Sequence, residues 1–309
     1  VASDKATQMN FAEKRWNNPN VLAAPTTSVP LTKTFDMVHF YHTDNAISAN
    51  EQTYANRAGT YLQLNWKPAD SWASAGGGNS TVNTDIDAMA NAIKALSPQK
   101  VLLSVFHEPE DNVSSGNCTS NASGASAGSP TDYVNMWHNV RSRFDAKGVS
   151  NVVWNMNYMG YSGWNCLVPL LWPGNNYVDW VTWDPYGSTS KLFSASVTDF
   201  YTYLTNNSNA TQNYASKPWG LAEFGYNNKN GTSTQANAIA YWNDAKTAIT
   251  NATFPKLKLY SVFDTSTNGT SQVGVDFSGA VSVSEQTAYN GFLDAILAME
   301  PSAQPTTTT

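Results

Sequence analysis

Short apolar runs alternate along the chain with longer amphipathic stretches, which is the pattern of β/α units built around a parallel sheet. Each run has the length of a buried strand, and the distances between runs leave room for a helix and its loops. We therefore predict seven strands, at Phe35–Tyr41, Thr60–Trp66, Lys100–His107, Asn151–Met156, Tyr177–Asp184, Pro218–Phe224 and Lys256–Phe263.

Four of the intervening stretches carry apolar residues at spacings of three and four, which predicts helices with one buried face. Thr84 is expected to cap the first helix and Thr131 the second, because a threonine hydroxyl can accept hydrogen bonds in a helix's first turn. The last helix follows the capping-box pattern from Ser282 to Glu285. The buried faces are Ile86, Met89, Ile93 and Leu96; Tyr133, Trp137, Val140 and Phe144; Ile239, Trp242, Ala245 and Ile249; and Tyr289, Phe292, Leu293 and Ile296.

This order of elements predicts an α/β fold, and 309 residues suit a single-domain (β/α)8 TIM barrel. The seven predicted strands are one short of a closed barrel, so the first strand is either the weak run Asn20–Ala24 or lies elsewhere. We expect the barrel domain to occupy residues 1–300. Residues 301–309 (PSAQPTTTT) are typical of a Pro/Thr-rich linker or tail.

Composition excludes several classes of protein. The net charge of −6 argues against a nucleic-acid partner, because such surfaces need clustered Lys and Arg. No apolar run approaches the ~18 residues of a membrane span, and 38 aromatic residues (11 Trp, 15 Tyr and 12 Phe) argue against disorder. The sequence has no glycine-rich phosphate loop and no clustered metal ligands. We expect a monomer without a cofactor or metal ion.

The chain contains two cysteines, Cys118 and Cys166, each within a stretch rich in Ser, Gly and Asn. Exposed free thiols are a liability, so a disulfide formed in an oxidising compartment is the favoured interpretation. The alternative is two unrelated reduced cysteines. Low charge, the expected disulfide and the Thr-rich tail together suggest a secreted, extracellular protein.

In a (β/α)8 barrel the chemistry lies at the carboxyl ends of the strands. Glu108 and Glu223 each stand at the tip of an apolar run, where a barrel would direct them toward the central cleft. Two such carboxyl groups on either side of a sugar are the minimum machinery of glycoside hydrolysis, one protonated and the other ionised. The alternative is that each glutamate only pairs with a lysine or arginine.

Several segments, in order, resemble glycoside hydrolase family 26, which includes endo-β-1,4-mannanases and belongs to a group of retaining (β/α)8 enzymes. The segment KVLLSVFHEPED is similar to the family's fourth strand with its His-Glu pair, and KPWGLAEFGY to its seventh strand. WPGNNYVDWVTWDPYG resembles strand six and its exit, while FDMVHFYH and RAGTYLQLNWKP match strands two and three more loosely.

The resemblance implies that Glu108 is the general acid/base and Glu223 the nucleophile. It also implies that His107 holds the nucleophile or a sugar hydroxyl, and that Tyr186 reaches toward Glu223. A phenol hydrogen bond would favour the ionised carboxylate and fix its rotamer.

Three positions depart from the family pattern. The fourth strand lacks the arginine that often precedes the His-Glu pair, and Pro109-Glu110-Asp111 stands where Met-Asn-Gly is common. Strand eight ends in Val262-Phe263-Asp264 instead of the usual tryptophan. The first two put the subsite beside the acid in question, and the third the identity of the reacting sugar.

Aromatic residues near the strand ends favour a carbohydrate ligand, because sugar rings stack on indole. Trp154 and Trp183 lie within strands and are interpreted as core, whereas Trp66, Trp72, Trp164 and Trp172 lie near loop residues and are candidate platforms. We expect the substrate-binding residues to be His42, Trp66, His107, Asn157, Trp164, Asp184 and Tyr186.

The sequence thus predicts a secreted, retaining endo-β-glycanase that acts on a polysaccharide. β-1,4-Mannan is the first choice because most of the resembling family acts on it. Two alternatives remain, namely a β-1,3-xylanase or mixed-linkage β-glucanase of the same family, and a non-catalytic barrel that only binds polysaccharide.

Overall fold

The seven strands predicted from the apolar runs are all present in the computed structural model, which describes residues 35–114, 116–118, 126–229, 235–263, 265–268, 271–273 and 283–299. They are β1 (Met37–His42), β2 (Tyr61–Trp66), β3 (Val101–Val105), β4 (Val152–Tyr158), β5 (Trp180–Trp183), β7 (Trp219–Lys229) and β8 (Leu257–Val262). The two-residue strand β6 (Tyr186–Gly187) also pairs with β7. The predicted strand Asn20–Ala24 and the 301–309 tail lie outside the described residues.

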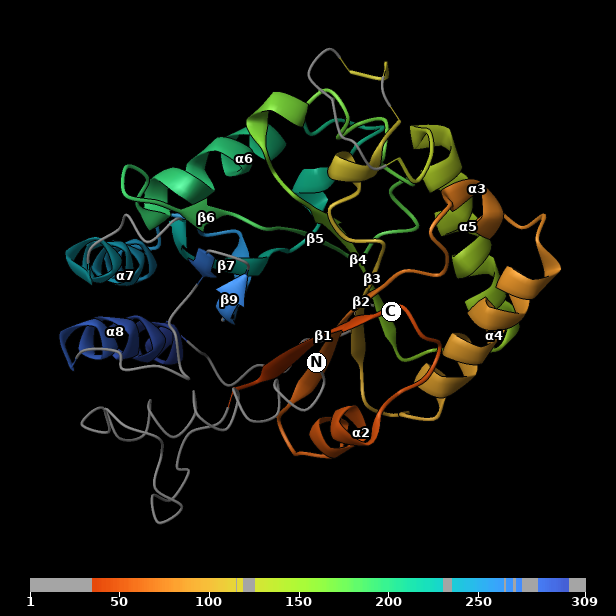
Figure 1. The fold of residues 1–309 in the computed structure, drawn as a ribbon, viewed down its shortest axis with the longest axis horizontal. Helices are drawn as coiled ribbons and strands as arrows, with labels where there is room; N and C mark the ends of the chain where they lie inside the picture. Colours follow the sequence, from red (N-terminus) through yellow and green to blue (C-terminus); the bar gives the residue numbers. More distant parts are fainter. Residues whose placement is uncertain are drawn as a thin grey trace.

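The sheet runs in the order β1-β2-β3-β4-β5-β7, with β8 on the far side of β7, and all of these pairings are parallel. A small antiparallel extension, β9 (Thr265–Asn268) and β10 (Ser271–Val273), continues from the end of β7. The sheet is curved and helices cover its outer side (Figure 1). The fold is a single-domain (β/α)8 barrel, as the sequence predicts, and parallel pairing brings the carboxyl ends of its strands to one face.

The four predicted helices are also confirmed, as α4 (Ser80–Lys94), α5 (Pro130–Ala146), α7 (Gln235–Thr250) and α8 (Val283–Met299). The sequence prediction missed α6 (Phe193–Asn207) and two short helices, α2 (Ala49–Ala55) and α3 (Trp72–Ala75). In α6 the buried positions Phe193, Val197, Phe200 and Leu204 do follow helical spacing. Its many Ser, Thr and Tyr residues have low helix propensity and obscured that pattern.

The two predicted threonine caps were wrong. α4 begins earlier, at the Asn79 cap, whose side chain accepts hydrogen bonds from Thr81 and Val82 N–H, and Thr84 lies inside the helix. α5 begins after Ser129, which forms a capping box with Asp132. In each case a better acceptor a few residues upstream, followed by unbroken helical spacing, extends the helix. Ser282 lies outside the described residues.

The barrel interior is polar rather than apolar. Asn155 on β4 donates to Ser104 on β3 and to Thr182 on β5, at 2.8 Å in each case. Gln63 on β2 crosses the barrel and donates to the carbonyl of Ala222 on β7, at 3.2 Å. Since side chains alternate between the two faces of a strand, the apolar residues of these strands face the helices. Polar side chains therefore line the inner face toward the carboxyl ends of the strands.

None of the described helices is long and apolar enough to cross a bilayer.

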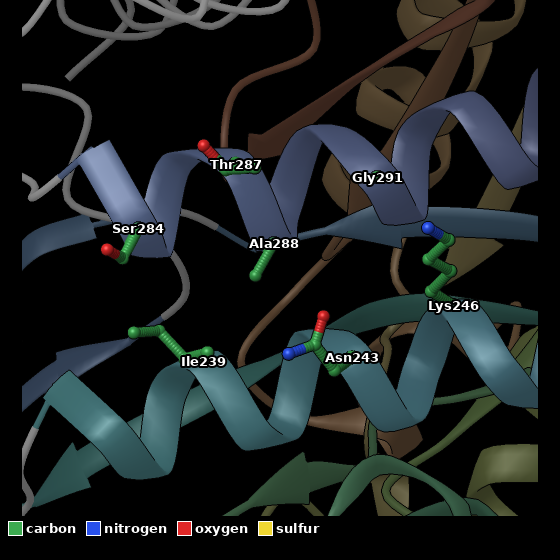
Figure 2. Close-up of a pocket in the computed structure, with 7 residues that line it drawn as sticks. All are labelled: Ile239, Asn243, Lys246, Ser284, Thr287, Ala288 and Gly291. Carbon is green, nitrogen blue, oxygen red and sulfur yellow. The ribbon is translucent and has the colours of Figure 1, made fainter.

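A groove of about 350 Å³ runs between α7 and α8 on the outside of the barrel, where side chains of the two helices face one another (Figure 2). It is lined by Ile239, Asn243, Lys246, Ser284, Thr287, Ala288 and Gly291.

Candidate active site

Glu108 stands on a sharp turn directly after β3. The backbone takes positive φ angles at Phe106 (56°) and at Glu108 (49°), which a residue with a side chain adopts only where its surroundings hold it. The Glu108 N–H donates to the carbonyl of Asn157 at 3.0 Å, which ties this turn to the end of β4. A short 3-10 helix, η1 (Pro109–Asn112), follows at once.

Glu223 lies on β7 and is 7% exposed. Two phenols donate to its carboxylate, Tyr41 to Oε1 and Tyr186 to Oε2, the latter at 2.7 Å. His107 Nε2 lies 4.0 Å from Oε1 of the same carboxylate. Burial raises the pKa of both tyrosines well above its usual value, so both phenols keep their protons and act as donors. The carboxylate is thus held in one orientation and its ionised form is stabilised.

Asp184 lies between the two glutamates. It is buried at the end of β5 and accepts the Glu223 N–H at 3.0 Å. The Asn157 side-chain amide donates to both of its oxygens, at 3.0 Å. The carboxyl groups of Asp184 and Glu108 also interact, and each affects the pKa of the other. Asp184 thus connects the backbone of Glu223 with the carboxyl group of Glu108.

Electrostatics place a proton on Glu108 at neutral pH. Burial, then the negative charge of Glu223 and then that of Glu110, raise the pKa of Glu108 to about 8, against the opposing hydrogen bond from Asp184. Burial and the same glutamate charges also raise the pKa of Asp184. A carboxyl group protonated at neutral pH beside one stabilised as an anion is the division of labour that general acid catalysis requires.

This arrangement predicts a pH dependence. With Glu108 as the general acid, the role that the sequence resemblance implies, the kcat/KM for a polysaccharide substrate should fall as the pH rises through about 8, because Glu108 then loses its proton. An aryl glycoside with an acidic leaving group needs little protonation, so its kcat/KM should lack this alkaline decline. Parallel pH profiles of the two substrates check the expectation, and identical profiles would contradict it.

The sequence prediction missed Tyr41, which donates a hydrogen bond to Glu223. It lies on β1, where Val38, Phe40 and His42 are buried on the side of the helices and the alternate residues His39 and Tyr41 face the barrel. The Tyr41 and His107 rings meet edge to face, with centroids 5.3 Å apart. The alternation of apolar and polar residues in β1 was the available signal.

The same alternation corrects the prediction for His42. Its ring faces α2 instead of the cleft, where Nε2 is hydrogen-bonded to Glu51 and Nδ1 lies 2.6 Å from Asp44 Oδ1. Burial lowers the pKa of His42, but these hydrogen bonds outweigh it and the net pKa is raised. His42 fastens the loop between β1 and α2, and its side-chain hydrogen bonds go to Asp44 and Glu51 and not to Glu108 or Glu223.

Trp66 was also wrongly predicted as an open platform. It is fully buried on the helix side of β2, where it packs against Phe144 of α5 and donates to Asn45 at 3.2 Å. Trp72 packs beneath α5, and Trp172 packs on Tyr214, so neither of these candidate platforms can stack on a sugar. A large indole side chain stabilises the fold more when it is buried away from water than when it stays exposed, even where it lies beside a loop.

Trp164 has a different position, on the rim of the barrel. It lies on the short 3-10 helix η2 (Ser162–Trp164), after β4, and it is half-buried. Its ring meets that of Tyr161 edge to face at 5.3 Å, and Tyr161 is 57% exposed. The remaining predicted residues, His107, Asn157, Asp184 and Tyr186, all lie around Glu223, although Asn157 reaches it through Asp184.

The predicted disulfide joins Cys118, in the loop after β3, to Cys166, in the loop after β4. It closes the rim beside Glu108 and brings η1 and η2 under one covalent constraint. The two cysteines are 48 positions apart in the sequence.

Opening this disulfide should destabilise the protein. A loop of this length is expected to contribute up to about 4 kcal/mol through the entropy of the unfolded chain. The double variant Cys118→Ser with Cys166→Ser should therefore lower the free energy of unfolding measured with denaturant under non-reducing conditions. The wild-type protein measured with a reductant is the matched control and should approach the variant. A free energy of unfolding equal to that of the oxidised wild type would contradict the expectation.

Comparison with solved structures supports the fold. The catalytic domain of a family 26 endo-β-1,4-mannanase from Bacillus sp. JAMB-750 is 14% identical, with 94% of this chain and 90% of that chain covered and a TM-score of 0.56. The family 26 domain of an endo-β-mannanase/endo-β-glucanase from Prevotella bryantii is 20% identical, with 82% and 79% covered and a TM-score of 0.50. A mannanase from Bacillus subtilis is 13% identical, with 82% and 75% covered and a TM-score of 0.52. No curated protein matches the chain.

A family model provides the assignment. The model of glycosyl hydrolase family 26 matches residues 42–251, which include Glu108, Asp184, Tyr186 and Glu223. The match covers more than half of the chain and includes the three carboxyl residues of the site, Glu108, Asp184 and Glu223. The chain therefore belongs to glycosyl hydrolase family 26, and it is a retaining glycoside hydrolase.

Proposed function

We propose that the protein is a secreted endo-β-1,4-mannanase in which Glu108 is the general acid/base and Glu223 the nucleophile. The residue roles rest on the arrangement of three carboxyl groups, those of Glu108, Asp184 and Glu223. Glu223 receives two phenol hydrogen bonds, while burial and the charges of Glu223 and Glu110 raise the pKa of Glu108 to about 8. The mannanase activity named for the similar structures supports the choice of sugar.

In the first step Glu223 attacks the anomeric carbon as Glu108 donates its proton to the glycosidic oxygen, which leaves with the bonding electrons. A glycosyl ester on Glu223 results. In the second step the Glu108 carboxylate takes a proton from a water molecule, whose oxygen displaces Glu223 from the same carbon. Two inversions give net retention, and Glu108 regains its proton.

Phe263 supports a sugar site beside the nucleophile, at the position where the family commonly has tryptophan. Its ring meets the rings of Tyr41 and Tyr186 edge to face, with centroids 6.2 and 6.3 Å apart. A phenyl face offers less stacking area than an indole, so the sugar in this subsite would depend more on hydrogen bonds.

The deciding experiment measures reducing ends released from β-1,4-mannan, galactomannan, β-1,3-xylan and mixed-linkage β-glucan. Mannan cleavage with a rapid fall in viscosity is expected, because an endo-acting enzyme cuts within the chain. Preferred cleavage of xylan or β-glucan would overturn the choice of sugar. Binding without any release from the panel would instead favour the non-catalytic barrel.

The rim pair Tyr161 and Trp164 is expected to bind the leaving part of the chain, since it follows β4 next to the acid turn. The stacking of a sugar ring on an aromatic side chain is lost in Tyr161→Ala and in Trp164→Ala. Each should weaken oligosaccharide affinity by roughly tenfold, if one aromatic contact contributes ~1–1.5 kcal/mol. Calorimetric titration of Glu223→Gln variants avoids hydrolysis during the measurement. Leu170→Ala, at another exposed apolar residue of the same loop, is the matched control, and an equal loss there would contradict a specific platform.

A further inference from the structure

Glu110 is a buried carboxylate that the proposed reaction does not use. It follows Glu108 by two residues, lies in η1 and is 1% exposed. Its oxygens accept hydrogen bonds from the main chain of the loop after β4. Met159 N–H lies 3.0 Å from both oxygens and Gly160 N–H 3.3 Å from Oε1. Burying a carboxylate is costly even when it is hydrogen-bonded, so apolar packing alone does not account for this residue.

These hydrogen bonds continue the contact between β3 and β4 beyond the point where strand pairing ends. The last paired residues are Leu103 and Trp154. After them the chain turns at positive φ, and Glu108 N–H bonds to the Asn157 carbonyl at 3.0 Å. The Glu110 carboxylate then accepts hydrogen bonds from Met159 and Gly160, the first two N–H groups after β4. A side chain has replaced the backbone as acceptor where the acid-bearing turn can no longer pair as a strand.

The opposite loop is shaped to meet this carboxylate. Gly160 has a φ of +76°, and a Cβ placed there would lie 2.9 Å from Trp183 Cδ1. Only glycine fits both the conformation and the space. The turn at Gly160 allows consecutive N–H groups to point at Glu110, and Tyr161 of the rim pair comes next in the chain.

We propose that Glu110 is a positioning residue that fastens the acid-bearing turn to the loop after β4 and so holds Glu108 in line with the glycosidic oxygen. The inference rests on the proposed function, because it takes Glu108 as the acid. It goes further in giving a role to the segment Pro109-Glu110-Asp111, in which this chain departs from the family pattern.

The charge of Glu110 acts on several neighbours. Burial raises the pKa of Glu110 to about 7, while the N–H hydrogen bonds oppose this. The groups that interact with its charge are Glu108 and Asp111 on its own segment, Tyr133 on α5, Tyr158 on β4 and Asp184 after β5. Both phenols donate elsewhere, to backbone carbonyls at 3.1 Å, and do not neutralise it. Ionised Glu110 therefore helps to keep Glu108 protonated.

Glu110→Ala and the isosteric Glu110→Gln test the proposal, with Asp111→Asn as the control. Asp111 is the next acidic residue and is exposed, so its replacement removes one negative charge near Glu108. The first readout is amide hydrogen exchange at Met159 and Gly160. It should be about 10- to 100-fold faster in Glu110→Ala, as for loss of hydrogen bonds to a charged acceptor, and unchanged in Asp111→Asn.

The second readout compares kcat/KM on mannan with that on a 2,4-dinitrophenyl β-mannoside. Glu110→Ala should lower the value for mannan by about tenfold and leave the aryl glycoside within about twofold, because only mannan needs a placed acid. Glu110→Gln should also move the alkaline limb for mannan to lower pH than Asp111→Asn does. Should Glu110→Ala fail to fold, Glu110→Gln decides on its own, with faster exchange at Met159 and Gly160 and the lower alkaline limb expected.

Two results would overturn the proposal, namely unchanged exchange at Met159 and Gly160, or an equal loss on both substrates. If the wild-type enzyme were inactive on every substrate, the proposed function would fail. Amide exchange would still decide whether Glu110 fastens the two loops, so the two failures are distinguishable.

Discussion

Glu223→Ala is expected to lose hydrolysis of both mannan and activated aryl glycosides, by on the order of 10⁵-fold in kcat. Without this carboxylate no glycosyl ester forms, and an acidic leaving group does not help because the attacking atom itself is missing. Initial rates on both substrates measure the loss. The product of the wild-type enzyme, followed by NMR, should first have the β configuration.

Glu223→Gln keeps the shape of the side chain, so its oligosaccharide affinity should stay within about tenfold of wild type if sugar stacking supplies most of the binding. Asp199→Asn, at a surface carboxylate on α6 that pairs with Lys191, should retain full activity. Loss of binding as complete as the loss of activity would show that Glu223 has been given the wrong role. An α-configured first product would point to inversion instead.

Glu108→Ala should separate the two steps. On mannan the loss of the general acid is expected to cost about 10²- to 10⁴-fold in kcat/KM. On a 2,4-dinitrophenyl glycoside the first step should be nearly unchanged, because that leaving group departs without a proton. The second step still needs a base for water, so the glycosyl enzyme should accumulate and appear as a burst of dinitrophenol followed by slow turnover.

Azide should restore turnover in Glu108→Ala, because it is a nucleophile that needs no general base and the shortened side chain leaves room for it. The expected product is a β-glycosyl azide, identified by NMR. Glu223→Ala is the matched comparison and should gain nothing from azide as a route to this β product. A Glu108→Ala variant without a burst, or one that azide does not accelerate, would contradict the assignment of Glu108 as acid/base.

The apolar periodicity was enough to predict seven strands of the barrel and four of its longer helices, but it did not reveal α6. Burial of apolar side chains is local in sequence for a β/α unit, since each strand and the helix that follows cover one another. Helix starts were less predictable, because Thr84 and Thr131 are acceptable caps that compete with Asn79 and Ser129 a few residues upstream. The helix begins at the best acceptor that precedes an unbroken apolar face. The free energies of the competing caps differ by only a few tenths of a kcal/mol to about 1 kcal/mol.

Glu108 and Glu223 could be found from the sequence because each stands at the end of an apolar run, and a parallel barrel collects the carboxyl ends of its strands on one face. The sequence also favoured a disulfide between Cys118 and Cys166, which the structure contains. These features depend on strand order and on residue type, and both can be read directly from the sequence.

Which side of a strand each residue faces is marked only weakly in the sequence, by alternation in β1, and was settled by the tertiary structure. Tyr41 and His42 are adjacent, yet Tyr41 donates to Glu223 and His42 is fastened to Glu51 behind the sheet. Both faces of a barrel strand are buried, so hydrophobicity alone does not separate them. Trp66 was misplaced for the same reason. The proton on Glu108 likewise depends on burial and on charges brought from β7 and η1, which are close only after the chain has folded.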